Sequence, residues 1–355
     1  MGVHVHSGYL YAAQLQQGAG REAVTACAEL PENAPGALLG GLRRLFDSGP
    51  FRGRRVVTAL PAADVEVRPL RLPPGISIKD AGFRQALLAE ARSSLLYDPN
   101  EAVLDYLPFP EEATDSEQRH TVLLISSRRE RVNRFLATFR EAGLRCEHLE
   151  VAPCAATRAL GKRSGCYAMV DIDRHQTVIS IAQEGCMRFS RTVKSGYDVW
   201  RQALCQAMDL AEEVAIDLLW EHGVAPDGEH VYDLERAFAA EPVQPGAVST
   251  KVFEICGRGM ENLVKEVRRT MDYFALLPGG GAVREIVLLG DILPKGLDQL
   301  FELRLKMDTV IATPERLIRL DAPPPLQPQA RERARAEHRA AARWTVATGL
   351  AMRGN

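Results

Sequence analysis

The chain has 355 residues, of which 46% are hydrophobic and 25% charged, with a formal net charge of -2. This composition is typical of a folded globular protein, and the length predicts two or three folding units. The near-neutral charge argues against a nucleic-acid or membrane-surface protein, and no stretch approaches the roughly 18 apolar residues needed to cross a bilayer. The first residues lack a basic segment followed by an apolar one, so we expect no signal peptide.

In the first half, apolar periodicities of two and of about 3.6 residues predict strands alternating with helices. We expect strands at residues 3–6, 9–15, 56–60, 65–72, 102–106 and 121–126, helices at 38–46, 80–96 and 129–142, and a final strand and helix within 145–160. An acidic loop covers residues 108–117. The segment Gly161–Gly165 is glycine-rich and basic, which indicates a hinge between domains.

The second half repeats this plan. We expect strands at residues 167–171, 177–183, 185–193, 285–289 and 309–312, and helices within 199–220 and at 251–277, 297–305 and 331–352. A Gly/Pro-rich stretch at 223–246 and a Pro-rich loop at 321–328 separate them. Each half therefore begins with a strand-turn-strand unit, which predicts a duplicated α/β fold.

The seven cysteines are scattered and form no C-x-x-C pair, which fits neither a zinc framework nor a disulfide scaffold. We expect reduced side chains, mostly in the core, as in a cytoplasmic protein. Motifs of the Walker, Gly-x-Ser-x-Gly and His-Glu-x-x-His types are absent from the sequence. The basic helix from Arg331 interleaves arginine with glutamate and lacks aromatic residues, which favours a solvated face over a nucleic-acid stripe.

Polar residues gather at the turn of each strand-turn-strand unit. The first unit carries His4 and His6 before Ser7 and Gly8. Two imidazoles offer a metal ion two ligands with no evident third, so a structural role is favoured and no metal site is predicted.

The second unit carries Asp171 and Asp173, and its next strand resumes at Thr177. Carboxylates at such a turn can hold Mg²⁺ near a phosphate, although taken alone they fit a solvated turn better. The glycine run at 279–281 precedes a strand instead of following one, so it is typical of a linker rather than a phosphate loop. The position after that strand holds Gly290 and Asp291.

The order and spacing of four stretches resemble the PilM family of type IV pilus assembly proteins, which is related to the division protein FtsA. They are Val57–Pro61 with Arg68–Pro74; Glu90 and Ala91 with Tyr97, Glu101 and Leu104–Tyr106; Val170–Ile172 with Thr177, Gly185 and Arg191; and Ile286–Leu288 with Gly296–Asp298 and Gly349–Arg353. The MshI type and the type II secretion protein GspL are close variants of this resemblance.

The resemblance implies a duplicated actin-like (ribonuclease H-like) fold around a nucleotide cleft, with an inserted domain of the 1C type. The expected divisions are subdomain 1A at 1–63, the insert at 64–145, the return of 1A with the hinge at 146–165, subdomain 2A at 166–205, subdomain 2B at 206–260 and the return of 2A at 261–355.

The three nucleotide loops depart from the family pattern together. His4 stands where the family has Asp, His6 where it has Gly, and Asp173 where the second hairpin has Gly. The adenosine-side loop has Gly290-Asp291 in place of a Gly-Gly pair. A side chain at the glycine position blocks the approach of backbone to phosphate, and an added carboxylate repels it. We therefore expect no cofactor, with ATP and Mg²⁺ disfavoured, and no catalytic residue.

The expected function is that of a non-catalytic cytoplasmic scaffold, held at the inner membrane by its partner. The resemblance implies that the partner is the short cytoplasmic N-terminal peptide of a PilN-like inner-membrane protein, and that motor ATPases are coupled through the scaffold. The partner groove is predicted to be lined by apolar residues that could equally form the insert's own core. They are Val65, Val67, Leu70, Leu72, Leu87 and Leu88. The alternatives are an active ATPase with Asp171 as the metal-positioning acid, and an oligomer or filament of the FtsA kind.

Overall fold

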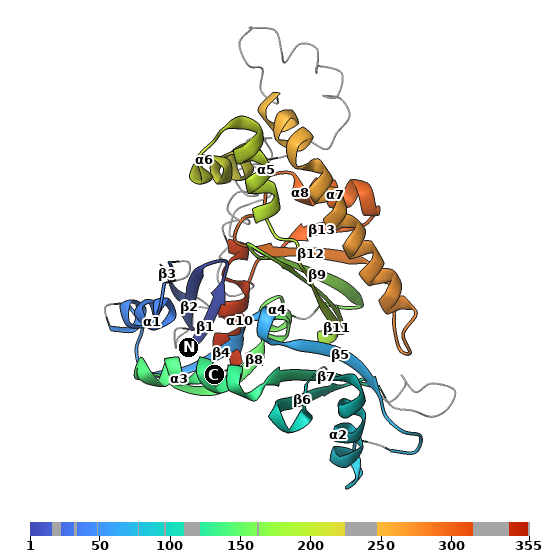
Figure 1. Cartoon of the computed structure of the whole chain (residues 1–355). Helices are drawn as coiled ribbons and strands as arrows, with labels where there is room; N and C mark the ends of the chain where they lie inside the picture. The colour runs from blue at the N-terminus through green and yellow to red at the C-terminus, as the bar shows by residue number, and fades with distance from the viewer. Residues whose placement is uncertain are drawn as a thin grey trace.

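The computed structural model describes residues 1–15, 23–31, 34–47, 49–76, 78–95, 97–109, 121–161, 163–223, 247–314 and 341–353. Most of the acidic loop and the Gly/Pro-rich stretch, all of the Pro-rich loop, and the first ten residues of the predicted last helix lie outside these ranges. Figure 1 shows two sheets one above the other, with a smaller third sheet beside the lower one.

The first sheet contains five strands in the order β3-β2-β1-β4-β8. They are β1 (Gly2–His6), β2 (Tyr9–Leu15), β3 (Ala23–Glu29), β4 (Arg55–Leu60) and β8 (Arg145–Val151). The first three form an antiparallel meander, and β4 runs parallel to β1 and to β8. Helices α1 (Ala37–Asp47) and α3 (Arg129–Glu141) share an apolar cluster with Val3 of β1. Because side chains alternate along a strand, His4 and His6 face the opposite side.

The second sheet repeats this arrangement in the order β11-β10-β9-β12-β13. Its strands are β9 (Cys166–Ile172), β10 (Thr177–Gln183), β11 (Cys186–Val193), β12 (Glu285–Gly290) and β13 (Asp308–Ile311). The meander is again antiparallel, and β12 runs parallel to β9 and β13. The matching order and strand directions confirm the predicted duplication of an α/β unit.

Helices of the second half bury the larger apolar core of the molecule. Leu204 and Phe274 are among its fully buried side chains. The helical segments are α5 (Asp198–Met208), α6 (Glu212–Asp217), η3 (Leu218–His222), α7 (Ala247–Ala275) and α8 (Leu297–Leu305). In Figure 1 the long helix α7 runs along one side of this half.

A three-stranded sheet is inserted between β4 and β8 in the order β5-β7-β6. Its strands are β5 (Glu66–Arg71), β6 (Ala102–Pro108) and β7 (Thr121–Arg128), with helix α2 (Phe83–Ser94) and the short turns η1 (Ala62–Asp64) and η2 (Pro99–Glu101). Helix α2 covers one face of this sheet through Phe83, Leu87 and Ala91, which are all buried. Because β7 lies in the middle, β5 and β6 are edge strands.

Two features of the fold differ from the prediction. Strand β3 was not predicted, because it is an edge strand of mostly small residues that pairs with β2 alone. The helix predicted for 331–352 is interrupted by a turn at Arg343 and Trp344, and α10 begins only at Thr345. The Trp344 ring packs edge-on against Tyr11 at a centroid distance of 5.1 Å, which ties the turn to the first sheet.

Helix α10 (Thr345–Arg353) packs between the first sheet and α4 (Ala152–Ala159). Glycine is required where the backbones meet. A Cβ atom on Gly349 would lie 1.8 Å from the Ala155 carbonyl oxygen, and one on Gly2 would lie 2.0 Å from the Ala347 carbonyl oxygen. The guanidinium of Arg158 donates to the Gly349 carbonyl oxygen at 2.6 Å.

Replacing Gly349 with alanine is expected to lower the free energy of unfolding by about 3 kcal/mol, because the new methyl group overlaps backbone that cannot move aside freely. The matched control is Gly40→Ala in α1, where a Cβ has no neighbour within 4 Å. That variant is expected to gain about 0.5–1 kcal/mol, since alanine favours helix more than glycine does. Urea unfolding measures the stability of both variants. Equal stabilities of Gly349→Ala and Gly40→Ala would contradict close backbone packing at Gly349.

Candidate functional site

The turn between β1 and β2 brings the first polar group to the site. Ser7 and Gly8 have φ values of 51° and 79°, as in the two-residue turns that suit antiparallel hairpins. The Gly8 carbonyl oxygen accepts a hydrogen bond of 2.7 Å from the Leu30 amide. The Ser7 side chain is thereby fixed at the end of the sheet and is 6% exposed.

The turn between β9 and β10 supplies the facing acids. The Asp173 amide donates to the Gln176 carbonyl oxygen at 2.9 Å, and the Asp173 carbonyl oxygen accepts from the Tyr197 amide at 3.1 Å. A Cβ on Gly196 would lie 2.2 Å from that carbonyl oxygen, so only glycine lets the segment before α5 approach the turn. The Asp173 carboxylate also accepts from the Arg174 amide at 2.6 Å.

The end of β12 supplies a third acid. Gly290 has a φ of 136°, and a Cβ there would lie 2.4 Å from the Ile172 carbonyl oxygen. Glycine is therefore needed for the chain to leave the sheet beside β9. The next residue, Asp291, is 4% exposed and reaches the end of β1.

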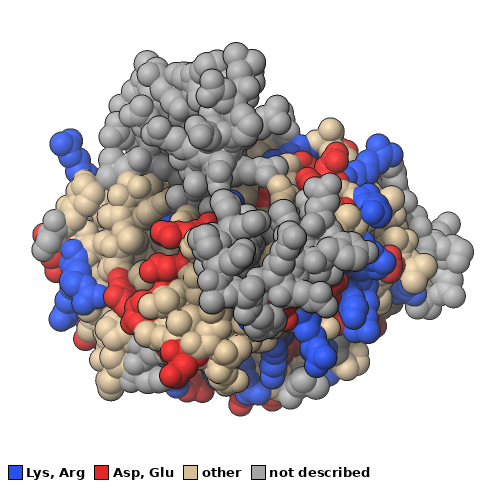
Figure 2. Space-filling model, turned by 90° about the horizontal axis from the view of Figure 1, so that it is seen from above, with Lys and Arg blue, Asp and Glu red and all other residues tan. Residues whose placement is uncertain are grey.

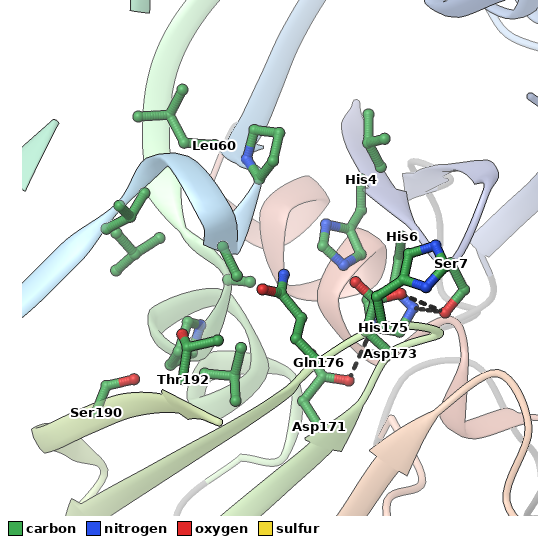
Figure 3. A pocket seen from close by; sticks show the side chains of 18 of the residues that line it. His4, His6, Ser7, Leu60, Asp171, Asp173, His175, Gln176, Ser190 and Thr192 are labelled. Atoms are coloured by element: carbon green, nitrogen blue, oxygen red, sulfur yellow. Dashed lines mark hydrogen bonds and ion pairs between the residues drawn. The ribbon is translucent and has the colours of Figure 1, made fainter. Parts of the chain in front are cut away.

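These three turns place charged groups of both halves in contact. The Ser7 hydroxyl donates to Asp173 Oδ1 at 2.8 Å and lies 3.0 Å from His6 Nδ1. His6 Nε2 lies 3.2 Å from Asp171 Oδ1, and His6 Nδ1 lies 3.3 Å from Asp291 Oδ2. In Figure 3 the His4 and His6 side chains from β1 point toward the acids of the β9–β10 hairpin. His6 thus bridges two carboxylates of the second half.

The two histidines experience opposite electrostatic environments. Burial alone would lower the pKa of His6, but the carboxylates of Asp171, Asp173 and Asp291 outweigh it and raise that pKa well above 6.5. Burial, together with the neighbouring His6 charge, lowers the pKa of His4 to about 3.

The pKa of Asp173 is also set by burial and by nearby polar groups acting in opposite directions. Burial would raise its pKa, but the His6 charge, the Ser7 hydroxyl and the Arg174 amide outweigh burial and lower it. His6 and Asp173 are therefore both charged near neutral pH, whereas His4 is neutral.

A cavity of about 220 Å³ opens beside this cluster. Its polar side carries residues of the two hairpins, and its apolar side carries Leu60, Pro61, Val65, Val67 and Val151. The volume is below the range of roughly 300–1,000 Å³ that is usual for small-molecule sites. A smaller cavity adjoins it and is lined by His4, His6, Asp171, Gly290 and Asp291, among others.

The structure therefore gathers nearly all the residues predicted for the degenerate cleft. They line one or other of the two cavities: His4, His6, Ser7, Gly8, Asp171, Asp173, Gly290 and Asp291. Thr177 is fully buried instead, and its hydroxyl donates to the Ser195 carbonyl oxygen at 2.6 Å.

The residues predicted for the partner groove are divided between three places. Val65 and Val67 line the larger cavity. Leu88 is 37% exposed. The remaining three are buried where α2 packs on its sheet, so they offer no surface to a partner: Leu70, Leu72 and Leu87.

Two contacts at the site were not predicted from the sequence. The hydrogen bond between Ser7 and Asp173 joins residues 166 positions apart, and only the packing of the two halves brings them together. Asp291 contacts Tyr11 as well as His6, and its carboxylate adds to burial in raising the pKa of Tyr11. The polar turn residues of each half gave a partial signal for the first contact.

The surface of the molecule mixes both charges. Figure 2 shows acidic side chains gathered toward the left-hand middle of the upper face and basic ones along its right side. Among the described residues no helix combines the length and the apolar character needed to span a membrane.

Comparison with known proteins identifies similar chains. The family described as "Type IV pilus assembly protein PilM" matches residues 32–222, more than half of the chain. The solved structure of a PilM-PilN type IV pilus biogenesis complex is similar over 99% of this chain and 97% of the other, with a TM-score of 0.73 and 21% identity. The ethanolamine utilization protein EutJ from Carboxydothermus hydrogenoformans is similar over 99% and 88%, with a TM-score of 0.50 and 12% identity. No curated protein shows significant similarity.

These structural similarities confirm the predicted actin-like fold. They are too distant in sequence to assign the chemistry of the cleft, which depends on the residues of this chain.

The contact between Ser7 and Asp173 leads to a stability prediction. We expect Ser7→Ala to lower the free energy of unfolding by about 1.5–3 kcal/mol, because it removes a hydrogen bond to a partly buried carboxylate. The control is Ser93→Ala on exposed α2, whose hydroxyl bonds only its own helix, with an expected change within about 0.5 kcal/mol. Urea unfolding monitored by circular dichroism compares them. A Ser7→Ala variant as stable as the control would contradict the cross-half contact.

Proposed function

The chain belongs to the PilM family of type IV pilus assembly proteins, and we propose that it acts as a non-catalytic scaffold that binds the cytoplasmic N-terminal peptide of a PilN-like inner-membrane protein. The observation that carries the proposal is the likeness, along nearly the whole chain, to a structure solved as a PilM-PilN complex. In this proposal the scaffold lies at the inner membrane through its partner and couples motor ATPases to it.

The larger cavity supports an extended peptide as the ligand. It lies between β5, an edge strand of the insert, and β11, an edge strand of the second sheet. Val65 and Val67 line it from the insert, and Ser190 and Thr192 line it from β11. Each pair is separated by two positions, so its side chains point the same way and can form pockets for peptide side chains, while the main chain of an edge strand can pair with the peptide. The apolar wall suits leucine-like anchors of a peptide.

The polar cluster supports weak or absent nucleotide binding. By comparison with the family pattern, Asp173 and Asp291 replace glycines of two nucleotide loops, and the His6 side chain fills the position of another family glycine. Two unit charges about 5 Å apart interact by about 3 kcal/mol at an effective dielectric constant of 20. A single such repulsion weakens affinity by about a hundredfold. The residues present therefore do not fit a bound triphosphate.

The second candidate function is an active ATPase. The survival of Asp171 at the end of β9, where a carboxylate can position a metal, is the observation that favours it.

If the peptide binds in the larger cavity, a bulky side chain placed there should weaken peptide binding. The exposed Thr192 lines the cavity, so Thr192→Trp is expected to weaken binding of a synthetic peptide with an apolar tetrad by about tenfold or more, which is the loss of about 1.4 kcal/mol. The control is Val214→Trp on α6, a 45% exposed position away from the cavity, with unchanged affinity expected. Fluorescence anisotropy measures both. No capture by the wild-type chain at tens of micromolar peptide would overturn the proposal.

Calorimetric titration with Mg-ATP separates scaffold from ATPase. The scaffold predicts micromolar or weaker binding, and an Asp171→Ala variant that still captures the peptide as the wild type does. Tight Mg-ATP binding that Asp171→Ala abolishes would instead favour the ATPase. The protein must be free of contaminating ATPase.

A further inference from the structure

We propose that His4, His6 and Asp171 form a binding site for a late first-row transition metal ion such as Zn²⁺, which joins the two halves of the molecule. One nitrogen of each imidazole and one carboxylate oxygen all lie within 4.8 Å of one another. The sequence showed only two ligands in the His-x-His stretch, and the fold supplies the third from the opposite half.

The spacing of the ligand atoms is close to that of a metal centre. Around a tetrahedral Zn²⁺ with bonds of about 2.0–2.2 Å, ligand atoms are about 3.3–3.6 Å apart. His6 Nε2 and Asp171 Oδ1 are already 3.2 Å apart. The His4 and His6 rings are neighbours on β1, with centroids 5.3 Å apart.

His4 gives the independent indication of a ligand. Its side chain is 5% exposed, and neither ring nitrogen has a hydrogen-bond partner among the described residues. A buried polar group without a partner costs about 1–3 kcal/mol in mutational experiments, so such groups are rare in native proteins. A metal ion bound to one of these nitrogens removes part of that cost.

The surroundings of His6 fit a metal ligand as well. Its Nδ1 lies 3.3 Å from the Asp291 carboxylate and 3.0 Å from the Ser7 hydroxyl, while Nε2 faces Asp171. A ligating histidine usually donates its other ring N–H to a carboxylate, which fixes its tautomer and orientation. The Ser7 hydroxyl is hydrogen-bonded to Nδ1 and the Asp291 carboxylate lies beside it, so Nε2 faces Asp171 and gives up its proton when the ion binds.

The donor set selects the class of ion. Two imidazoles and one carboxylate suit Zn²⁺ and its neighbours in the first transition row. Mg²⁺ and Ca²⁺ prefer oxygen ligands alone and are disfavoured here. Since His4 and His6 belong to the first half and Asp171 to the second, a bound ion would hold the cleft together from within. This role is independent of peptide capture at the apolar side of the larger cavity.

The test uses the full chain without a histidine tag, stripped of metal with a chelator and then titrated with Zn²⁺ by calorimetry. We expect one ion per chain with a micromolar or lower dissociation constant, and a higher melting temperature with Zn²⁺ than without. Replacing a residue that only supports a metal ligand typically weakens metal affinity by about tenfold to hundredfold, and we expect this loss of Zn²⁺ affinity for Asp291→Asn. We expect at least as large a loss for each ligand variant: His4→Gln, His6→Gln and Asp171→Asn.

The matched control is His175→Gln. His175 lines the same cavity with a 65% exposed side chain but lies outside the proposed ligand set, so the affinity for Zn²⁺ should be unchanged. Co²⁺ bound to the wild-type chain gives a readout that does not depend on the folding of variants, because a tetrahedral site produces intense visible absorption. Absence of saturable Zn²⁺ binding, equal loss in His175→Gln, or weak six-coordinate Co²⁺ absorption would each overturn the proposal.

Discussion

The contact of His6 with Asp171 and Asp291 is the interaction on which the arrangement of the two halves depends. The imidazole comes from the first sheet and both carboxylates from the second. All three groups lie in a largely desolvated position, where removing one charged partner leaves the others uncompensated. Ser7 adds a hydrogen bond to Asp173 across the same boundary. The two halves therefore meet through specific polar contacts as well as apolar packing.

These contacts change what an actin-like cleft can do. A backbone turn open to phosphate needs small residues and positive potential. Here the equivalent turns carry His6, which forms ion pairs with Asp171 and Asp291, and the space beside them is partly apolar. Under the proposed scaffold function, such a cleft serves a fixed geometry between the halves rather than a cycle of nucleotide binding and release.

The sequence predicted the fold well because its signals are local. Most strands and helices, such as β2 at Tyr9–Leu15 and α8 at Leu297–Leu305, follow from apolar periodicity alone. It missed β3, whose pairing with β2 is its main source of order, and the turn at Trp344, which depends on contact with Tyr11. The PilM resemblance supplied the connectivity that periodicity cannot provide.

The site was only partly predictable for the same reason. The turn residues identified where the two halves would meet, but not which atoms would pair. The role of Asp291 depends on Gly290 leaving β12 with a φ of 136°, and Ser7 reaches Asp173 only after both sheets have formed. The sequence was equally compatible with a surface groove and with a buried core for Leu70, Leu72 and Leu87. In the structure all three are buried where α2 packs on its sheet.

A double-mutant cycle of His6→Gln and Asp171→Asn tests whether this contact couples the two halves. The free energies of unfolding of the wild type, both single variants and the double variant are measured near neutral pH with a chelator present. The account predicts a coupling energy of about 1–3 kcal/mol between the two residues, as for groups within one charged network. A coupling energy within about 0.3 kcal/mol of zero, as for independent sites, would contradict it.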